Sequence, residues 1–562
     1  MVDKLADDII TRLSQLQTGR SHFESMWHQV ANVAAPEAYS IRRLGSMGMM
    51  KGLPKHAAAA ERSKYIFDST AISAIDRLAS GIEAIVTPQS DYWHGLDVFS
   101  LTRQKQSDQE KAWLQEVRDM QFKIRYDSDS GFIPAIQTIY RRVVAFGNAF
   151  LFLEDDDRYA KRSMMMYRYL PLAECYIATD HLDVVETFYR YYTLTAGQAL
   201  GKFREKCPPK VRQAAESLTD KDKEFAFIQC IHPRGDFGLP GEGIKKSPYA
   251  SFHVFEEDRS IIRESGYYEF PVIDFRWLPE PGSIYGEGPV MRALADIQSL
   301  QQMAKNELWA GEQAVKPTLL MANAGVMNRP TSKPGHIVLG GLNAAGQRMV
   351  EPMFQGQRLD FATMVLEAKR NQVKESMYLH LFQLLVQNPQ MTATEALIRA
   401  KEKGELLGPA GARFQLSLSR MIDREQGILT RRGLYDPDSD FAVPESLQDQ
   451  DIVPQMSSPL DRLRRAQEGE GIMRMLEIAS PMAQIDPEVL DEIDPGWTLR
   501  ELRDILGAPV RMLRDPEEVV KRKQARQEQQ SALANAQIAE QMASASKQGS
   551  QALAGMQQAG AL

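Results

Sequence analysis

The 562-residue sequence has little cysteine: only Cys175, Cys207 and Cys230 occur, and they form no CxxC pair. This scarcity argues against a disulfide framework and a cysteine-based zinc site, and it fits a reducing cytoplasm. No uninterrupted apolar run reaches the ~18 residues that a membrane span requires. The N-terminal stretch MVDKLADDIITRLSQL carries acids where an export signal carries basic residues. It therefore predicts an amphipathic helix of a soluble protein.

Positive charge is not in excess either. The 67 Lys and Arg residues face 74 Asp and Glu residues, a formal net charge of −7, which excludes a general attraction to nucleic acid or anionic membranes. The motifs GxxxxGK[ST], HExxH and GxSxG do not occur, so no enzyme, cofactor site or metal site is indicated. Acid pairs such as Asp155 with Asp157 and Glu256 with Asp258 are interpreted as solvated turn residues. They leave a metal-dependent nuclease as the weakest alternative.

Helical periodicity prevails up to about residue 130. In the segment FDSTAISAIDRLASGIEAIVTP, apolar residues recur every three or four positions and predict a core-facing helix that Pro88 stops. Asp68 or Ser69 is suited to accept hydrogen bonds from the first turn. The recurring residues are Ile72, Ile75, Leu78, Ile82 and Ile85.

Aromatic and β-branched residues then become frequent, which predicts a β-rich block between about 140 and 280. Within it Ala250, Phe252 and Val254 alternate with Ser251 and His253, the pattern of a strand with one buried face. The lone histidines His253 and His380 are interpreted as satisfied or exposed side chains and not as catalytic bases. Trp93 and Trp277, each beside prolines, are expected to fill gaps in a core.

Two long helices follow the YGEGP segment (285–289) and flank a Gly-, Pro- and Asn-rich excursion over 317–356. The first carries an apolar stripe from Val290 to Leu308 and must end before Pro317. The second is predicted as an apolar stripe about 25 residues long. Its members are Phe361, Met364, Val365, Ala368, Met377, Leu381, Leu384 and Leu385. This arrangement is typical of a mixed α+β assembly protein without an active site.

A capping box marks the next helix start: Thr392 and Glu395 stand in S/T-x-x-E relation, so each side chain is suited to accept from the other residue's N–H. A further helix is expected from about 410 to 432, stopping at Gly433 with Arg431 and Arg432 at its negative end. After about residue 520 the chain is rich in Ala, Gln and Ser and lacks aromatic residues. That tail is helix-competent but poor in core-forming side chains.

Several segments, in order, resemble the portal (head-to-tail connector) proteins of short-tailed phages. They are RSHFESMWHQVANVAAPE, FDSTAISAIDRLASGIEAIVTPQSDYWHGL, FGNAFLFLE, YGEGPVMRALADIQSLQQMAKNELWAGEQAVKP and NPQMTATEALIRAKEKGELLGPAGARFQ. The resemblance covers most of the chain up to about residue 435. The family pattern commonly has an aromatic residue after the tryptophan of the second segment, whereas here His94 follows Trp93, a departure that bears on local packing.

The resemblance implies an α+β, portal-like fold with a β-rich wing, a long-helix stem, a clip between the stem helices and a helical C-terminal crown. The implied regions are the wing over 1–285 with its β-rich part at 140–280, stem helices at 286–316 and 357–386, the clip at 317–356, a tunnel loop and following helices over 387–435, and the crown over 436–562, whose tail after 520 is either helical or disordered until assembly.

The resemblance also implies a homo-oligomeric ring, usually of about twelve subunits, at the portal vertex of the virion. Double-stranded DNA passes through it, driven in by a separate terminase motor. Other implied partners are major capsid, scaffolding and tail adaptor proteins; no membrane is involved, and assembly takes place in the host cytoplasm. A helical scaffolding or adaptor protein without a DNA channel is the main alternative.

Site candidates follow from this resemblance. Channel-facing basic residues are Lys369, Arg370 and Lys374, which would equally serve as salt-bridge partners between subunits, for instance with Glu367 or Glu375. Uncharged contacts in the tunnel loop are Asn388 and Gln390, and Thr392 with Glu395 would fix where that loop ends. Leu381 and Leu385 are candidates for subunit contacts, since a buried leucine contributes ~1.5–3 kcal/mol.

Overall fold

The computed structural model describes most of the chain. The described residues are 2–38, 62–99, 107–155, 163–237, 247–316, 318–321, 342, 345–347, 350–352, 359–379, 393–448, 450–456, 469, 471–479, 481–482, 493–506, 512–514 and 516–559. They form two compact units. The first comprises 1–99, 117–443 and 450–461, and the second comprises 100–116, 444–449 and 462–562.

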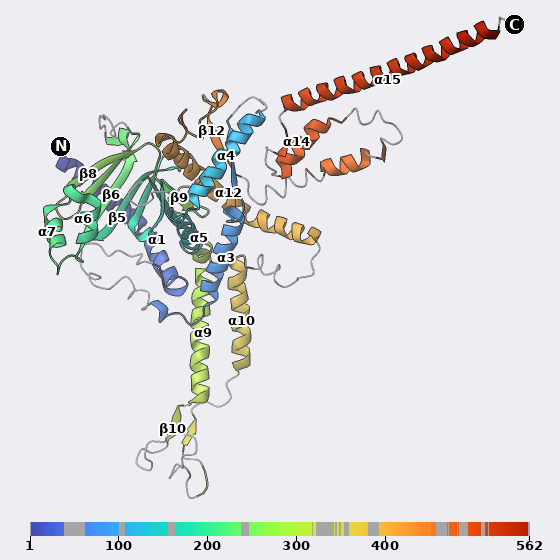
Figure 1. The fold of residues 1–562 in the computed structure, drawn as a ribbon. Helices are drawn as coiled ribbons and strands as arrows, with labels where there is room; N and C mark the ends of the chain where they lie inside the picture. The colour runs from blue at the N-terminus through green and yellow to red at the C-terminus, as the bar shows by residue number, and fades with distance from the viewer. Residues whose placement is uncertain are drawn as a thin grey trace. The chain divides into compact units, whose positions relative to one another are not determined.

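The first unit combines helices and sheets in an α+β architecture (Figure 1). Its helices are α1 (Val2–Val33), α3 (Thr70–Val86), the part of α4 (Asp108–Arg125) from Val117, α5 (Phe132–Phe146), α6 (Ala196–Phe203), α7 (Pro209–Glu216), α8 (Pro289–Arg292), α9 (Leu294–Val315), α10 (Leu359–Ser376) and α12 (Ala393–Arg431), with short 3-10 helices η1 (Leu172–Glu174), η2 (Arg204–Lys206) and η3 (Arg234–Phe237). Its strands are β1 (His94–Val98), β2 (Asn148–Glu154), β3 (Met166–Leu170), β4 (Cys175–Thr179), β5 (Val185–Thr195), β6 (Glu224–Pro233), β7 (Tyr249–Phe255), β8 (Ser260–Tyr267), β9 (Val272–Arg276), β10 (Leu319–Met321), β11 (Val350–Pro352) and β12 (Ile452–Met456).

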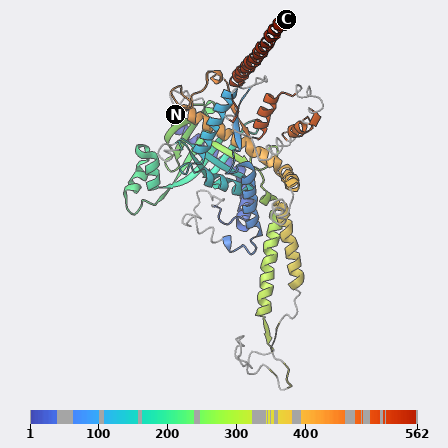
Figure 2. The same ribbon diagram turned by 45° about the vertical axis from the view of Figure 1, so that its right-hand side comes forward.

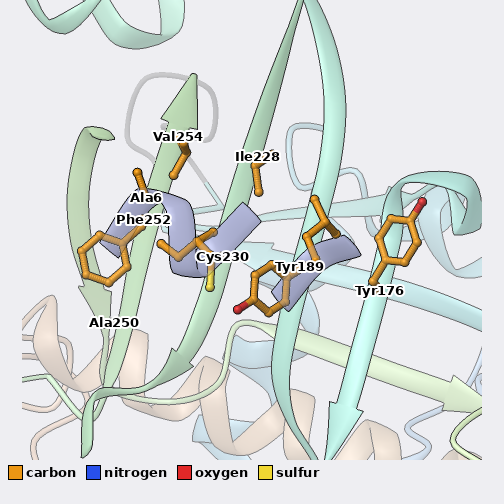
Figure 3. Packing of buried hydrophobic residues seen from close by; sticks show 10 residues of the cluster. Ala6, Tyr176, Tyr189, Ile228, Cys230, Ala250, Phe252 and Val254 are labelled. Carbon is orange, nitrogen blue, oxygen red and sulfur yellow. The ribbon is translucent and has the colours of Figure 1, made fainter. Parts of the chain in front are cut away.

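An antiparallel sheet of order β4-β5-β6-β7-β8 forms the main core. Its register places Tyr189 opposite Cys230 and Cys230 opposite Phe252, so these side chains share one face. Helix α1 covers that face with Ala6, Ile9 and Leu13 (Figure 3). The opposite face packs against α6 and α7 through a second cluster: Tyr192, Ala196, Ala199, Phe203, Cys207, Val211, Phe225, Phe227 and Phe255.

This two-sided cover corrects the prediction for β7. Ser251 and His253 are buried like Ala250, Phe252 and Val254, so the strand has no solvent face. His253 lies against the ring of Phe203 and its Nδ1 is 3.2 Å from the Tyr192 hydroxyl oxygen. It is therefore a satisfied core histidine, as the sequence predicted. Strand alternation failed because α6 and α7 cover the second face. The capping box of Thr195 with Gln198 and the proline that begins α7 were visible signals of these helices, and sequence reasoning missed them.

A second sheet, of order β3-β2-β9, packs against both α5 and α12, and these two helices also contact each other through Tyr140 and Phe414. Strand β2 starts at Asn148 directly after α5, so the β-rich block begins several residues later than residue 140. Trp277, which follows β9, is buried against Phe414 of α12, and Trp93 is buried with its Nε1 donating to the Tyr126 hydroxyl (3.0 Å). Both tryptophans fill the core as predicted.

Among the predicted helices, α3 is found as expected, whereas α10 and α12 need corrections. Helix α3 matches its prediction. Its N-cap residue is Ser69, which makes no side-chain capping bond, and Asp68 Oδ1 instead accepts from the N–H of Thr70 in the first turn (2.8 Å). Helix α10 ends at Ser376, about ten residues before the predicted end. Helix α12 runs through Gly408 and Pro409 as one helix, where two were expected, and stops before Gly433, which has φ +74°.

The second unit contains the start of α4, the 3-10 helix η5 (Glu445–Leu447), α14 (Pro495–Leu506) and α15 (Pro516–Ala559). Asp494 begins α14, because its Oδ1 accepts from the N–H groups of Gly496 (2.9 Å) and Trp497 (3.1 Å). The tail after 520 is helical, and its side chains from Val520 to Leu533 are exposed. Within the described part of the chain, no helix is both long and apolar enough to span a bilayer.

Candidate functional site

Helices α9 and α10 lie side by side as an antiparallel pair, with the two-stranded β10–β11 ribbon beyond them (Figures 1 and 2). At 1.5 Å per residue, the 22 residues of α9 span about 33 Å. The first half of α9 is buried against the body of the unit, mainly through Leu294, Ile297, Leu300, Gln301 and Ala304. The pair corresponds to the segments for which the sequence predicted two long helices around an excursion.

A buried glutamine joins α9 to two other helices. The Oε1 of Gln301 accepts from the backbone N–H groups of Phe67 (2.7 Å) and Asp68 (2.9 Å). Its Nε2 donates to the backbone carbonyls of Asp68 (2.7 Å) and Val33 (3.2 Å). One side chain thus satisfies four main-chain groups at the end of α1 and the start of α3, which is full use of an amide in a buried site.

Ion pairs attach α10 to the same place. The Nε of Arg370 donates to Asp68 Oδ2 (2.7 Å), and Arg370 also contacts Glu367. Lys369 Nζ lies 2.7 Å from Asp296 Oδ1 on α9. Burial alone would raise the pKa of Asp68, but hydrogen bonds from Thr70 and Arg370 outweigh it and hold the pKa below its ordinary value. We call Asp68, Asp296, Gln301, Lys369 and Arg370 the polar anchor.

Glycines fix the point at which α8 and α9 leave the β-sheet. Asn148 donates to the Gly286 carbonyl (2.9 Å) and accepts from the Gly286 N–H (2.9 Å), while the Trp277 N–H donates to the Gly147 carbonyl (2.8 Å). A Cβ on Gly147, which has φ +72°, would lie 2.2 Å from the Gly286 oxygen, and one on Gly286 would lie 2.2 Å from the Trp277 oxygen. Only glycine permits this approach. Gly147, Asn148, Gly286 and Gly288 are called the glycine junction.

Large apolar side chains remain exposed on the helix pair. Leu308 and Trp309 are 54% and 53% exposed, Val315 is 80% exposed, and Met364 on α10 is 73% exposed. Trp309 also lies 4.6 Å from the Nζ of Lys305. Together with Met303 these residues are the uncovered apolar side chains. Exposed large apolar side chains of this kind are suited to a contact with another protein.

The structure places the predicted site residues unevenly. Lys369 and Arg370 belong to the polar anchor, where their partners lie in the same chain. The sequence had suggested a channel contact or a salt bridge between subunits for them. Lys374 Nζ contacts Asn371 Oδ1 at 3.4 Å. Their channel role stays a prediction. The other candidates lie outside the described residues: His380, Leu381, Leu385, Asn388, Gln390 and Thr392. Glu395 lies in α12, but its side chain is not described.

The predicted apolar stripe of the second helix was wrong in part. Met364 is exposed, whereas Leu366 and Val373, which the predicted stripe omitted, are buried. Met377 is buried as predicted. Sequence reasoning also missed Gln301, although a glutamine on the face shared by Ile297 and Ala304 was a visible signal. Within the described ranges, no group of three or more His, Cys, Asp or Glu side chains is placed to hold a metal ion.

Comparison with known proteins decides the family. A family model described as bacteriophage head to tail connecting protein matches residues 6–513. The chain belongs to this family of connecting proteins. Two related phage proteins are named as portal proteins. The probable portal protein of Bordetella phage BPP-1 is 28% identical over 559 residues, covering 96% of this chain and 95% of that protein. The portal protein of Salmonella phage epsilon15 is 22% identical over 564 residues, covering 98% and 96%.

The resemblance noted from the sequence is therefore confirmed: this connector is a phage portal protein, with a structural and not an enzymatic role. Among solved structures, a chain in the neck of a native GTA particle computed with C12 symmetry is similar with a TM-score of 0.33 and 10% identity, covering 72% of this chain and 85% of that one. A chain in the neck of the empty GTA particle has a TM-score of 0.34.

Proposed function

We propose that this portal protein forms a closed homo-oligomeric ring of about twelve subunits at one vertex of the virion, and that double-stranded DNA passes through the ring. In this proposal α9 and α10 are the stem, the excursion over 317–356 is the clip that meets the terminase motor and later tail adaptors, and the β-rich block lies in the wing. The crown comprises 436–562. Capsid and scaffolding proteins meet the ring during assembly in the host cytoplasm.

The observation that carries the proposal is the exposure of large apolar side chains on both helices of the pair. Leu308, Trp309 and Val315 lie on α9, and Met364 lies on α10. In a ring, each subunit presents two different surfaces to its two neighbours. If α9 of one copy meets α10 of the next, these side chains are removed from water. Each one contributes about 1.5–3 kcal/mol to assembly when fully buried.

The basic residues of α10 divide into two groups under this proposal. Lys369 and Arg370 hold the helix pair to the body of their own subunit through Asp296 and Asp68. Lys374, in the last turn of α10, is then the basic residue left for the channel surface. A bore with few basic rings suits a conduit, because every added phosphate contact strengthens DNA binding and would slow its passage.

Mass measurement and negative-stain imaging of the purified full-length protein test the ring. We expect rings of about a dozen subunits around a hole wide enough for a duplex about 20 Å across. The variant Trp309→Asp should shift the population to monomers, because it places a charge among apolar side chains at each contact. Gln313→Asp, at an exposed position on the same helix, is the matched control and should leave rings intact.

Two outcomes would contradict this proposal. If Trp309→Asp forms rings as readily as Gln313→Asp, α9 does not lie at the contact between subunits. Helical assemblies without a central hole would favour the scaffolding or adaptor alternative over a DNA conduit.

A further inference from the structure

A buried cluster of charged side chains joins four elements of the first unit. The side chain of Arg125, the last residue of α4, is fully buried. Its Nε and Nη2 donate to the two carboxylate oxygens of Glu425 on α12 (3.1 and 2.5 Å). Its Nη1 lies 2.9 Å from His94 Nε2 on β1. The hydroxyl of Tyr167 on β3 donates to Glu425 Oε1 (2.7 Å).

The geometry assigns the protonation of His94. A guanidinium group only donates hydrogen bonds, so His94 Nε2 has to accept and its proton has to lie on Nδ1. The ring is fully buried and stacks on Phe122 at 4.7 Å between centroids. Burial first, and the positive charge of Arg125 second, lower the pKa of His94 well below its ordinary value.

Charge is balanced only while His94 is neutral. The charged and titratable groups around it are Arg118 and Arg125 on α4, Tyr126 directly after α4, Glu425 on α12 and Tyr167 on β3. Strand β12, which pairs with β1, contributes none. Glu425 compensates Arg125, and no second carboxylate contacts the His94 ring among the described residues. A proton on Nε2 would face a donor 2.9 Å away and place a second cation in the cluster. Both effects make burial of the protonated His94 ring unfavourable.

We infer that His94, Arg125 and Glu425 form an acid-sensitive lock, which holds α12 to α4 and β1 while His94 is neutral and releases them when His94 takes up a proton. The lock acts on the half of α12 from Ser417 to Arg431. The same half also contacts the sheet, where Ser417 Oγ donates to the Asp274 carbonyl (2.6 Å) and Arg424 Nε to the Leu153 carbonyl (3.0 Å). The inference does not depend on ring formation.

The direction and size of the effect follow from linkage. In the open form His94 reaches water and titrates near 6.5, whereas in the closed form it stays neutral over this range. Below 6.5 the open form therefore binds a proton that the closed form does not. The opening equilibrium constant should rise about tenfold between pH 7.5 and pH 5.5.

A second buried histidine supplies a matched control. His253 also has its pKa lowered well below its ordinary value, first by burial and then by Lys202, Arg263 and Arg190. It lies in the main sheet and contacts Tyr192. Replacing it should alter stability in acid without altering the response of α12.

Hydrogen exchange of the full-length protein, read as protection factors of peptides covering 94–98 and 417–431 at pH 7.5 and 5.5, tests the lock. The wild type should lose about tenfold protection in both peptides at pH 5.5. His94→Gln, which keeps an acceptor but cannot take up a proton in this range, should abolish the loss, and His253→Gln should retain it. A pH response in His94→Gln equal to that of the wild type would overturn the inference.

The wild type alone provides a second measurement, which matters if His94→Gln does not fold. The exchange rate of the imidazole C2 hydrogen reports the titration of each histidine separately. His94 should show no titration between pH 6 and 8 in the native protein, because burial and the charge of Arg125 keep it neutral. A native His94 that titrates near 6.5 would refute the lock.

Discussion

Replacing Gln301 with leucine removes all four hydrogen bonds that join α9 to the ends of α1 and α3. Leucine is similar in size, so the change removes polar contacts and leaves little empty space. The N–H groups of Phe67 and Asp68 lose their acceptor, and the carbonyls of Asp68 and Val33 lose a donor. The helix pair is thereby loosened where it meets the body of the subunit.

The magnitude follows from the buried groups left without partners. An unsatisfied buried amide costs about 1–3 kcal/mol. The Asp68 N–H is buried and the Phe67 N–H is partly buried, so together they cost about 2–5 kcal/mol. The carbonyls add less, because each has a second lone pair. Burying the leucine side chain offsets part of this cost. We expect a net loss of about 2–4 kcal/mol, a roughly 30- to 700-fold rise in local opening.

Hydrogen exchange of a peptide covering 63–75 is the suitable assay, because a chain with two units need not unfold in one step. The exchange rate of this peptide includes the backbone amides of Phe67 and Asp68, which lose their hydrogen-bond acceptor in the variant. Gln302→Leu, at the exposed neighbouring position whose amide bonds Asn306, is the matched control and should leave protection unchanged. The reasoning is refuted if Gln301→Leu changes the exchange of these amides by less than about fivefold.

Two further predictions concern backbone approach and the channel. Gly286→Ala puts a methyl group 2.2 Å from the Trp277 carbonyl oxygen and should destabilise the protein by about 1–3 kcal/mol. Gly311→Ala has no neighbour within 4 Å and should be neutral or stabilising by up to about 1 kcal/mol. Thermal unfolding midpoints compare the two, and equal midpoints would contradict the account of the glycine junction. Lys374→Glu should leave rings intact while lowering the amount of DNA packaged, and dissociated rings on imaging would instead indicate a salt bridge between subunits.

Local signals in the sequence predicted the elements that local forces determine. Helix α3 could be placed from its apolar spacing, and the hydrogen bond that Asp68 accepts from the first turn is one that the sequence predicted. Trp93 and Trp277 were correctly assigned to the core. By contrast, a separate helix was expected to begin at about residue 410, yet α12 continues through Pro409 as one helix. Tertiary packing of the half beyond the proline offers a reason, since Phe414 and Leu418 are fully buried.

The polar anchor could not be predicted because its partners are far apart in the chain. Arg370 pairs with Asp68 across 302 positions, and Gln301 binds Asp68 across 233. A charge that interrupts an apolar stripe shows only that its helix has a polar position there. It does not reveal which distant residue compensates that charge, so Lys369 and Arg370 were read as channel or neighbour contacts.

The glycine junction sets a direction as well as a position. Main-chain atoms of Gly147, Gly286 and Trp277 meet without side chains between them, so substitutions in the surrounding core have little means of tilting α9. In the proposed ring, this tilt is copied into every subunit. A deviation of a few degrees would add up around the circle, leaving a gap or producing an open spiral. Because the junction is made of backbone, it fixes the angle of α9 closely enough for the last subunit of the ring to meet the first.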